Sequence, residues 1–263
     1  MGSISLTRRD ENVLEKIKDP ESNPLTAVIV DSSLPKDPNT TDLGVYERVT
    51  KREKEIIMSM QQIEMQLAGL KVATTASSPI EEYQTCVSNL GELISDFPRY
   101  ASARNNRAQA MRRLYGDTLL LETSDPRALI QDANEDDRVQ AALTLLGDLD
   151  EAISLLTPKN LFGPISPVAG KTLSLAHTQR AAVYHTTAKS FSVGRQSLAD
   201  RKELGWSKVD FETAASRDFA LGGRYGNEIA KGLAVATNPT AKLCGQMVRE
   251  AMKKEYGPAF EGF

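Results

Sequence analysis

The stretch that decides the fold is Ala101-Ser102-Ala103-Arg104-Asn105-Asn106-Arg107-Ala108-Gln109-Ala110, which runs on to Leu114-Tyr115-Gly116-Asp117. Its small alanines recur at helical spacing, a proline lies just before them, and a Gly-Asp pair follows. Residues three and four apart share one face of a helix, so these alanines leave room for a neighbouring helix. We therefore predict a helix from about Ala101 to Tyr115 that packs tightly between other helices, with Ala108 buried.

Apolar residues three or four positions apart predict further helices on both sides of this stretch. The expected helices cover about 10–17, 46–72, 79–95, 136–156, 171–191, 207–221, 227–237 and 239–256. Four prolines make residues 19–43 a loop or linker on the surface. No segment alternates like a strand, and the sequence therefore predicts an all-α chain.

The alanine helix resembles the first helix of a tetratricopeptide repeat (TPR), a helix-turn-helix unit of about 34 residues that stacks because it cannot bury its apolar face alone. In the helix before it, Cys86 and Leu90 fit the small and large positions of that motif, Pro98 fits its proline, and Leu93 is larger than the motif expects. We therefore predict a TPR helix-turn-helix solenoid with three repeats, with insertions and with a C-terminal capping helix.

The predicted domains follow from this register. Residues 1–45 form an N-terminal helix and proline-rich loop, and residues 46–263 form the TPR domain. The repeats cover about 46–98, 101–157 and 171–221, followed by capping helices over about 222–256.

Two segments carry a more specific resemblance. The alanine stretch with Gly116-Asp117, and the tail Asn238-Pro239-Thr240-Ala241-Lys242-Leu243-Cys244 with Met247, resemble the tetratricopeptide repeat protein 36 family, also described as Hsp70-binding TPR proteins. This chain is longer, with extra residues after Leu70, after Asp117 and around 163–171. The resemblance implies a cytoplasmic, non-enzymatic adaptor with Hsp70 as a candidate partner and a link to tyrosine metabolism.

The groove of a TPR array is lined by the first helix of each repeat. Asn106, Gln109 and Arg113 share one face of the alanine helix and are therefore candidates for binding a peptide. Arg180 and Tyr184, in the first helix of the third repeat, complete the candidate set. A purely solvated or inter-helical role for these polar residues stays open.

Chaperone-binding TPR domains hold a C-terminal carboxylate with five polar residues. By resemblance, Asn106 matches the asparagine of the second repeat and Arg180 the arginine of the third. Ala176 stands where a lysine belongs, and Met58 stands where an asparagine is needed. The sequence thus predicts an incomplete clamp, in which an arginine can still hold a carboxylate with two hydrogen bonds.

Other classes of function fit poorly. A net charge of −3 does not suit a general nucleic-acid binder, and no apolar run is long enough to span a membrane. Cys86 and Cys244 lack metal-ligand spacing and suit two buried thiols in a reducing compartment. His177 and His185 have no third metal ligand at suitable spacing, and we expect no metal and no cofactor.

Three local patterns have ordinary structural interpretations. Residues 163–172 end like a P-loop but have Ile165 where its first glycine belongs. The acidic run 132–137 predicts a helix N-terminus, and the glycines of 221–226 predict a helix C-terminal turn. Residues 118–132 are expected to form a loop that is dispensable for folding.

Two functions therefore stay open. The first is an adaptor that docks a peptide or a chaperone segment in its concave face. The second is a structural subunit whose apolar faces are all used within one complex, without groove binding. The sequence leaves the oligomeric state open.

Overall fold

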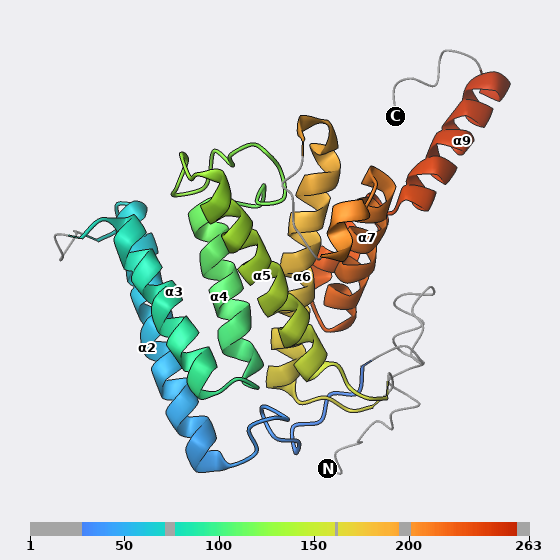
Figure 1. Cartoon of the computed structure of the whole chain (residues 1–263). Helices are drawn as coiled ribbons and strands as arrows, with labels where there is room; N and C mark the ends of the chain where they lie inside the picture. Colours follow the sequence, from blue (N-terminus) through green and yellow to red (C-terminus); the bar gives the residue numbers. More distant parts are fainter. Residues whose placement is uncertain (1–27, 72–76, 161–162, 195–200, 257–263) are drawn as a thin grey trace, which may run out of the picture.

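The computed structural model describes residues 28–71, 77–160, 163–194 and 201–256 (Figure 1). These residues form eight α-helices, two short 3-10 helices and no β-strand. The α-helices are α2 (Leu43–Leu67), α3 (Pro79–Asp96), α4 (Ala101–Tyr115), α5 (Glu135–Leu156), α6 (Pro167–Lys189), α7 (Lys208–Arg224), α8 (Glu228–Thr237) and α9 (Pro239–Tyr256). The 3-10 helices are η2 (Phe191–Val193) and η3 (Lys202–Gly205). The all-α prediction is confirmed, while the expected helix at 10–17 lies outside the described residues.

Consecutive helices pack against each other from α2 to α8, and α4 also contacts α6. The pairs α2/α3, α4/α5 and α6/α7 lie side by side along the molecule (Figure 1). The predicted TPR-like solenoid is thereby confirmed, with α8 covering α7 at its end. The division into residues 1–45 and 46–263, and the repeat boundaries, stay predictions.

Helix α4 lies between two apolar cores. Ala101 and Ala108 belong to the core formed with α5, α6 and α7, whereas Ala103, Ala110 and Leu114 belong to the core formed with α2 and α3. The four alanines are completely buried. Small side chains on both sides of one helix therefore let it pack against two groups of helices at once, as predicted for Ala108.

The segment before α2 runs along the ends of the central helices (Figure 1). We name residues 28–41 the strap. Asp31 N–H donates to the carbonyl of Ile165 at 2.9 Å, and the amide of Asn39 donates to the carbonyl of Leu155 at 3.0 Å. The strap is thus a surface loop, as predicted, and it also ties the end of α5 to the start of α6.

Asp37 of the strap caps α4 from outside the helix. The cap residue of α4, Tyr100, makes no side-chain capping bond. The Asp37 carboxylate instead accepts the N–H of Asn39 at 2.7 Å, and the backbone of Ala101 at the start of α4 also favours its charged form. Burial raises the pKa of Asp37, and these bonds only partly oppose it. A carboxylate at this position satisfies an unpaired N–H group and suits the positive end of the helix dipole.

The insertion after Asp117 packs against the body, and this burial disfavours the expectation that residues 118–132 are dispensable for folding. Leu119 and Leu121 are completely buried. Arg138 of α5 is also buried and donates to the backbone carbonyls of Thr118, Leu121 and Thr123. Because three carbonyls surround one guanidinium, residues 118–123 are fixed onto α5 and extend the core. The acidic end of the insertion does start a helix, as predicted, with Asn134 as the N-cap.

At the C-terminal end, one expectation is confirmed and another changes. Helix α7 ends at Arg224, and the turn expected within 221–226 follows at Gly226 with φ of 106°. Gly223 still lies inside the helix, where a side chain would meet the backbone of Lys231 at 2.7 Å. Cys86 is buried as expected, but Cys244 is exposed because most of α9 lies away from the body.

Replacing Ala108 by leucine should destabilise the protein by about 1–3 kcal/mol, because neither core has room for the added carbons. The measurement is urea unfolding, with Gln109→Ala on the exposed side of α4 as the matched control. An unchanged midpoint for Ala108→Leu would contradict the placement of α4 between two cores.

Replacing Leu121 by alanine should cost about 2–5 kcal/mol, as for other buried leucines that leave a cavity. Asp132→Ala, at an exposed position of the same insertion, should change stability little. If both variants unfold like the wild type, the insertion does not contribute to the core.

Candidate functional site

The predicted residues Gln109 and Arg113 of α4 line one hollow of about 380 Å³. We name it the α4 hollow. Glu64 of α2 and Tyr83 of α3 form part of its wall, and Asp117, Asp125 and Arg127 of the insertion complete it. The insertion thus enlarges a surface that begins on the solenoid helices.

Arg113 is held across the hollow by Glu64. Its Nε donates to Glu64 Oε1 at 2.7 Å, and its Nη1 donates to the carbonyl of Arg127 at 2.8 Å. The hydroxyl of Tyr83 also donates to Glu64, at 2.6 Å. Burial alone would raise the pKa of Glu64, but the hydrogen bonds from Arg113 and Tyr83 lower it. The pair remains partly exposed, with 32% of the Arg113 side chain and 44% of the Glu64 side chain accessible.

Two further ion pairs complete the hollow. Arg112 contacts both carboxylate oxygens of Asp117, at 2.6 and 2.9 Å. Arg127 contacts Asp125 at 3.3 Å, and 81% of the Arg127 side chain is exposed. The hollow is therefore balanced in charge, and Arg127 presents the most accessible of its guanidinium groups.

Asn106 lies further along the same face and bonds to a buried acid. Its amide donates to Glu53 Oε1 of α2 at 2.8 Å. The other Glu53 oxygen accepts the hydroxyl of Tyr100 at 2.5 Å. Burial raises the pKa of Glu53, although these hydrogen bonds favour its charged form. Asn106 thus uses an amide donor to hold α4 against α2.

Arg180 and Tyr184 lie elsewhere, among α5, α6 and α7. Arg180 donates to both oxygens of Asp218 of α7, at 2.7 and 2.8 Å, and to Asp150 of α5 at 2.6 Å. The hydroxyl of Tyr184 donates to Glu203 at 2.6 Å, and Tyr184 is only 1% exposed. The structure therefore brings Gln109 and Arg113 together but directs Arg180 and Tyr184 into the packing of the third helix pair.

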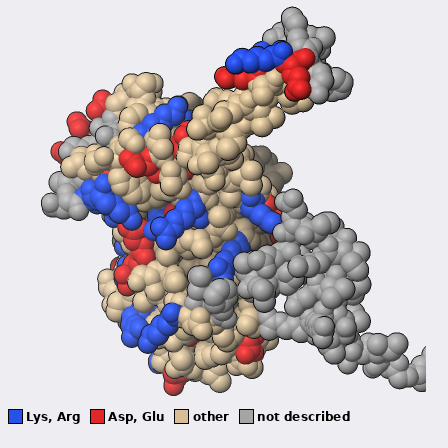
Figure 2. Space-filling model, turned by 90° about the vertical axis from the view of Figure 1, so that its right-hand side faces the viewer, with Lys and Arg blue, Asp and Glu red and all other residues tan. Residues whose placement is uncertain are grey.

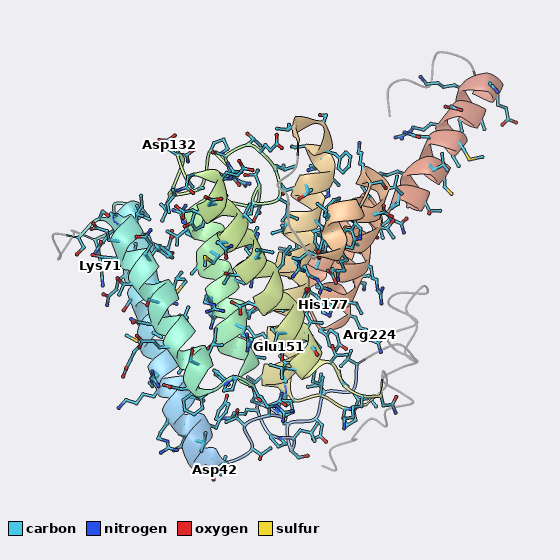
Figure 3. All side chains as sticks on the ribbon, viewed as in Figure 1. Asp42, Lys71, Asp132, Glu151, His177 and Arg224 are labelled. Carbon is cyan, nitrogen blue, oxygen red and sulfur yellow. The ribbon has the colours of Figure 1, made fainter. Side chains whose placement is uncertain are left out.

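His177, labelled in Figure 3, is buried on α6 and contacts the same acid. Its Nδ1 is 2.9 Å from Asp218 Oδ1, and its ring stacks on Tyr225. Burial alone would raise the pKa of Asp218, but the hydrogen bonds from Arg180 and His177 lower it. One buried carboxylate is thus shared by two side chains of α6 and links that helix to α7.

The chain has relatives of similar length. It is 36% identical over 256 residues to a protein of Aspergillus fumigatus named L-tyrosine degradation gene cluster protein hmgX, in an alignment that covers 95% of this chain and 93% of that protein. It is also 28% identical over 211 residues to human tetratricopeptide repeat protein 36, covering 80% and 81% of the two chains. The chain belongs to the tetratricopeptide repeat protein 36 family. The Danio rerio member is 28% identical over 206 residues, covering 78% of this chain and 76% of that member.

No protein-family model and no solved structure matches the chain. The described residues of this family member contain no group of three or more His, Cys, Asp and Glu side chains that could hold a metal ion. No helix in the described ranges is both long and apolar enough to cross a membrane. In the P-loop-like segment, Ser166 instead caps α6 by accepting the N–H of Ala169 at 3.2 Å.

Sequence reasoning missed the acidic partners and the insertion side of the hollow. Glu64 could have been suggested by its place on α2, in the helix pair that precedes α4, but nothing in the sequence pairs it with Arg113. In the sequence, Asp117 stands out only as part of the Gly-Asp pair after the alanine helix, and Arg127 only as one residue of the insertion. Peptide binding by this family member stays a prediction, and Gln109 and Arg113 are the residues that the geometry leaves accessible for it.

Asp218 should make stability depend on pH. Its pKa is lowered in the folded state, so its contribution is present above the unfolded value of about 3.9 and is lost as the pH falls through the folded value. Asp218→Asn should therefore be less stable at pH 7 and should lose less stability on acidification than the wild type. Urea unfolding at pH 7 and in the acid range measures both effects, with the exposed Asp132→Asn as the control. Parallel pH profiles for wild type and Asp218→Asn would contradict this role.

Proposed function

We propose that this chain is a non-enzymatic adaptor that binds an acidic segment of a partner protein in the α4 hollow. The observation that carries this proposal is the combination of an accessible amide, Gln109, with the guanidinium groups of Arg113 and Arg127 around one hollow on the first helix of the second pair. An acidic C-terminal segment, such as the tail of an Hsp70-type chaperone, offers the complementary carboxylates. Arginine can bind a carboxylate through two parallel hydrogen bonds.

Binding requires that Arg113 exchange Glu64 for a carboxylate of the partner. Exposed ion pairs contribute only about 0–1 kcal/mol, so partial separation of Arg113 from Glu64 costs little. Arg127 is even more exposed and can turn toward the partner without leaving the hollow. Gln109 adds an amide that can donate to a backbone or side-chain oxygen.

The site is weaker than a full carboxylate clamp. Arg180, the candidate arginine of the third repeat, is engaged by Asp218 and Asp150, and Asn106 is engaged by Glu53. Recognition therefore depends on partly exposed charges, which salt screens effectively. We expect moderate affinity that falls with ionic strength.

The biological setting follows from the relatives. The Aspergillus fumigatus relative is named for a tyrosine degradation gene cluster. We extend that setting to this chain and propose that it serves, in the cytoplasm, a protein of tyrosine degradation, either directly or together with a chaperone.

The alternative function is a structural subunit of a stable complex that does not use the hollow. The observation that favours it is internal pairing: Arg112, Arg113 and Arg127 each already contact a carboxylate of the same chain. If these pairs persist, the hollow has no unpaired arginine that could bind a carboxylate of a partner.

Titration calorimetry with an acidic C-terminal peptide of the Hsp70 type distinguishes these functions. The wild type should bind, and Arg113→Ala should lose about 1–3 kcal/mol, which is roughly five- to 150-fold in affinity. Arg127→Ala should also weaken binding, whereas Arg217→Ala, at an exposed position on α7, should not.

Equal affinity of the wild type and the Arg113→Ala/Arg127→Ala double variant would contradict the hollow as the binding site. Absence of peptide binding, together with recovery of the native protein in a stoichiometric complex, would favour the structural subunit. Repeating the titration at higher salt should weaken the wild-type interaction, because the proposed contacts are between charges.

A further inference from the structure

The last helix of the solenoid body has an open apolar face. Helix α8 buries Ala230, Ala234 and Thr237, which face α7. Its other side carries Ile229 and Val235, which are 77% and 68% exposed. We name Ile229, Gly232, Val235 and Ala236 the α8 outer face. A solenoid normally ends in a repeat with a polar outer face, so this apolar surface lacks the usual cap.

Helix α9 has an open apolar stripe of its own. Cys244, Met247, Val248 and Ala251 follow the i, i+3, i+4, i+7 spacing that places residues on one side of a helix, and all four are exposed. Met247 and Val248 are 61% and 57% exposed. Helix α9 extends away from the body as an arm (Figure 1), and Figure 2 shows uncharged surface along it with charges gathered near its end.

The connection between the two helices prevents α9 from folding back on its own α8. Only Asn238 separates Thr237 from Pro239, whereas an antiparallel helix pair needs a loop of about two to five residues. Asn238 has extended backbone angles, and its side chain caps α9 by accepting the N–H of Thr240 at 2.9 Å. Lys242 also ties the first turn of α9 to Glu212 of α7 at 2.9 Å. Within the described parts of the chain, the α8 outer face is therefore left uncovered and is open to a second molecule.

We propose that two copies of this chain exchange their α9 helices, so that the apolar stripe of each α9 packs on the α8 outer face of the other copy. The exchange buries two apolar surfaces that one chain cannot bring together. Reciprocal exchange produces a closed two-fold dimer, and short connections between elements favour such swaps.

The lengths of α8 and α9 and the small residues of the α8 outer face are compatible with an α9 helix from a second copy. Helix α9 has 18 residues and α8 has 10, corresponding to about 27 Å and 15 Å, so one α9 can cover the whole α8 outer face. A side chain at Gly232 would meet no atom within 4 Å, so the surface there is open to an approaching helix. The apolar side chains of Met247 and Val248 can then pack against the small residues Gly232 and Ala236.

Charge also favours another copy of this chain. Helix α9 carries four basic side chains, Lys242, Arg249, Lys253 and Lys254, and two acidic ones, Glu250 and Glu255. The whole chain has a net charge of −3. The arm is therefore cationic and the rest of the chain anionic, so the arm of one copy is attracted to the body of the other.

Sedimentation equilibrium of the full chain over a range of concentrations tests the exchange. The wild type should form dimers, and Val235→Glu on α8 or Met247→Glu on α9 should weaken dimerisation at least tenfold. Lys231→Glu and Gln246→Glu place the same side chain at exposed polar positions of the two helices and should leave the dimer intact. Both apolar positions are exposed within one chain, so circular dichroism should show unchanged helix content.

Oxidative cross-linking tests which helices meet. Ile229→Cys or Val235→Cys should form a disulfide with native Cys244 of the other copy, because Cys244 is exposed whereas Cys86 is only 4% exposed. Denaturing electrophoresis should show a covalent dimer that is lost when Cys244 is replaced by serine. The wild type under the same oxidant should form much less of it.

Three outcomes would overturn the proposal. If the wild type stays monomeric at all concentrations, the α8 outer face does not bind a second copy of this chain, and a different protein becomes its candidate partner. An intrachain disulfide shows that α9 returns to its own body. Equal cross-linking of the wild type shows that two α9 stripes pair with each other. Peptide binding at the α4 hollow should be the same in Val235→Glu and wild type, so this test is independent of the proposed function.

Discussion

The structure depends on the close packing of α4 between two apolar cores. Alanines on opposite sides of this helix permit contact with α2 and α3 on one side and with α5 and α6 on the other. Larger side chains would separate the two halves and would move Gln109 and Arg113 away from α2. The same small residues that allow the helices to stack therefore define the position of the hollow.

Polar contacts then fix the order and angle of the helices around α4. Asp37 caps α4 from the strap, Glu53 holds Asn106 from α2, and Asp218 holds Arg180 from α7. Each of these acids is buried, and an isolated buried carboxylate would be costly. Their partners lie on other helices or at a helix start, so the solenoid satisfies these groups only when its helices are assembled. The alanines allow the helices to pack closely, and the buried acids then determine which helices lie side by side.

The sequence was sufficient to predict the helices because each has local signals. Periodic apolar residues mark the buried faces, and side-chain caps mark several starts, such as Ser78 before α3 and Ser207 before α7. The predicted resemblance to the tetratricopeptide repeat protein 36 family is likewise confirmed.

The sequence could not reveal the contacts between residues that lie far apart in the chain. The bond from Arg180 to Asp218 and the cap from Asp37 to α4 join residues far apart in the chain, and the burial of Leu121 depends on Arg138, which follows the insertion. Cys244 was expected to be buried because free cysteines usually are, but the single residue between α8 and α9 keeps that helix away from the body.

Hydrogen exchange with and without an acidic C-terminal peptide tests the central claim most directly, because it locates binding along the chain. The account predicts slower exchange in α4 and in residues 117–127 when peptide is present, with little change in α6 and α7. Protection confined to α6 and α7, or no protection in α4 at a peptide concentration that saturates binding, would contradict the account.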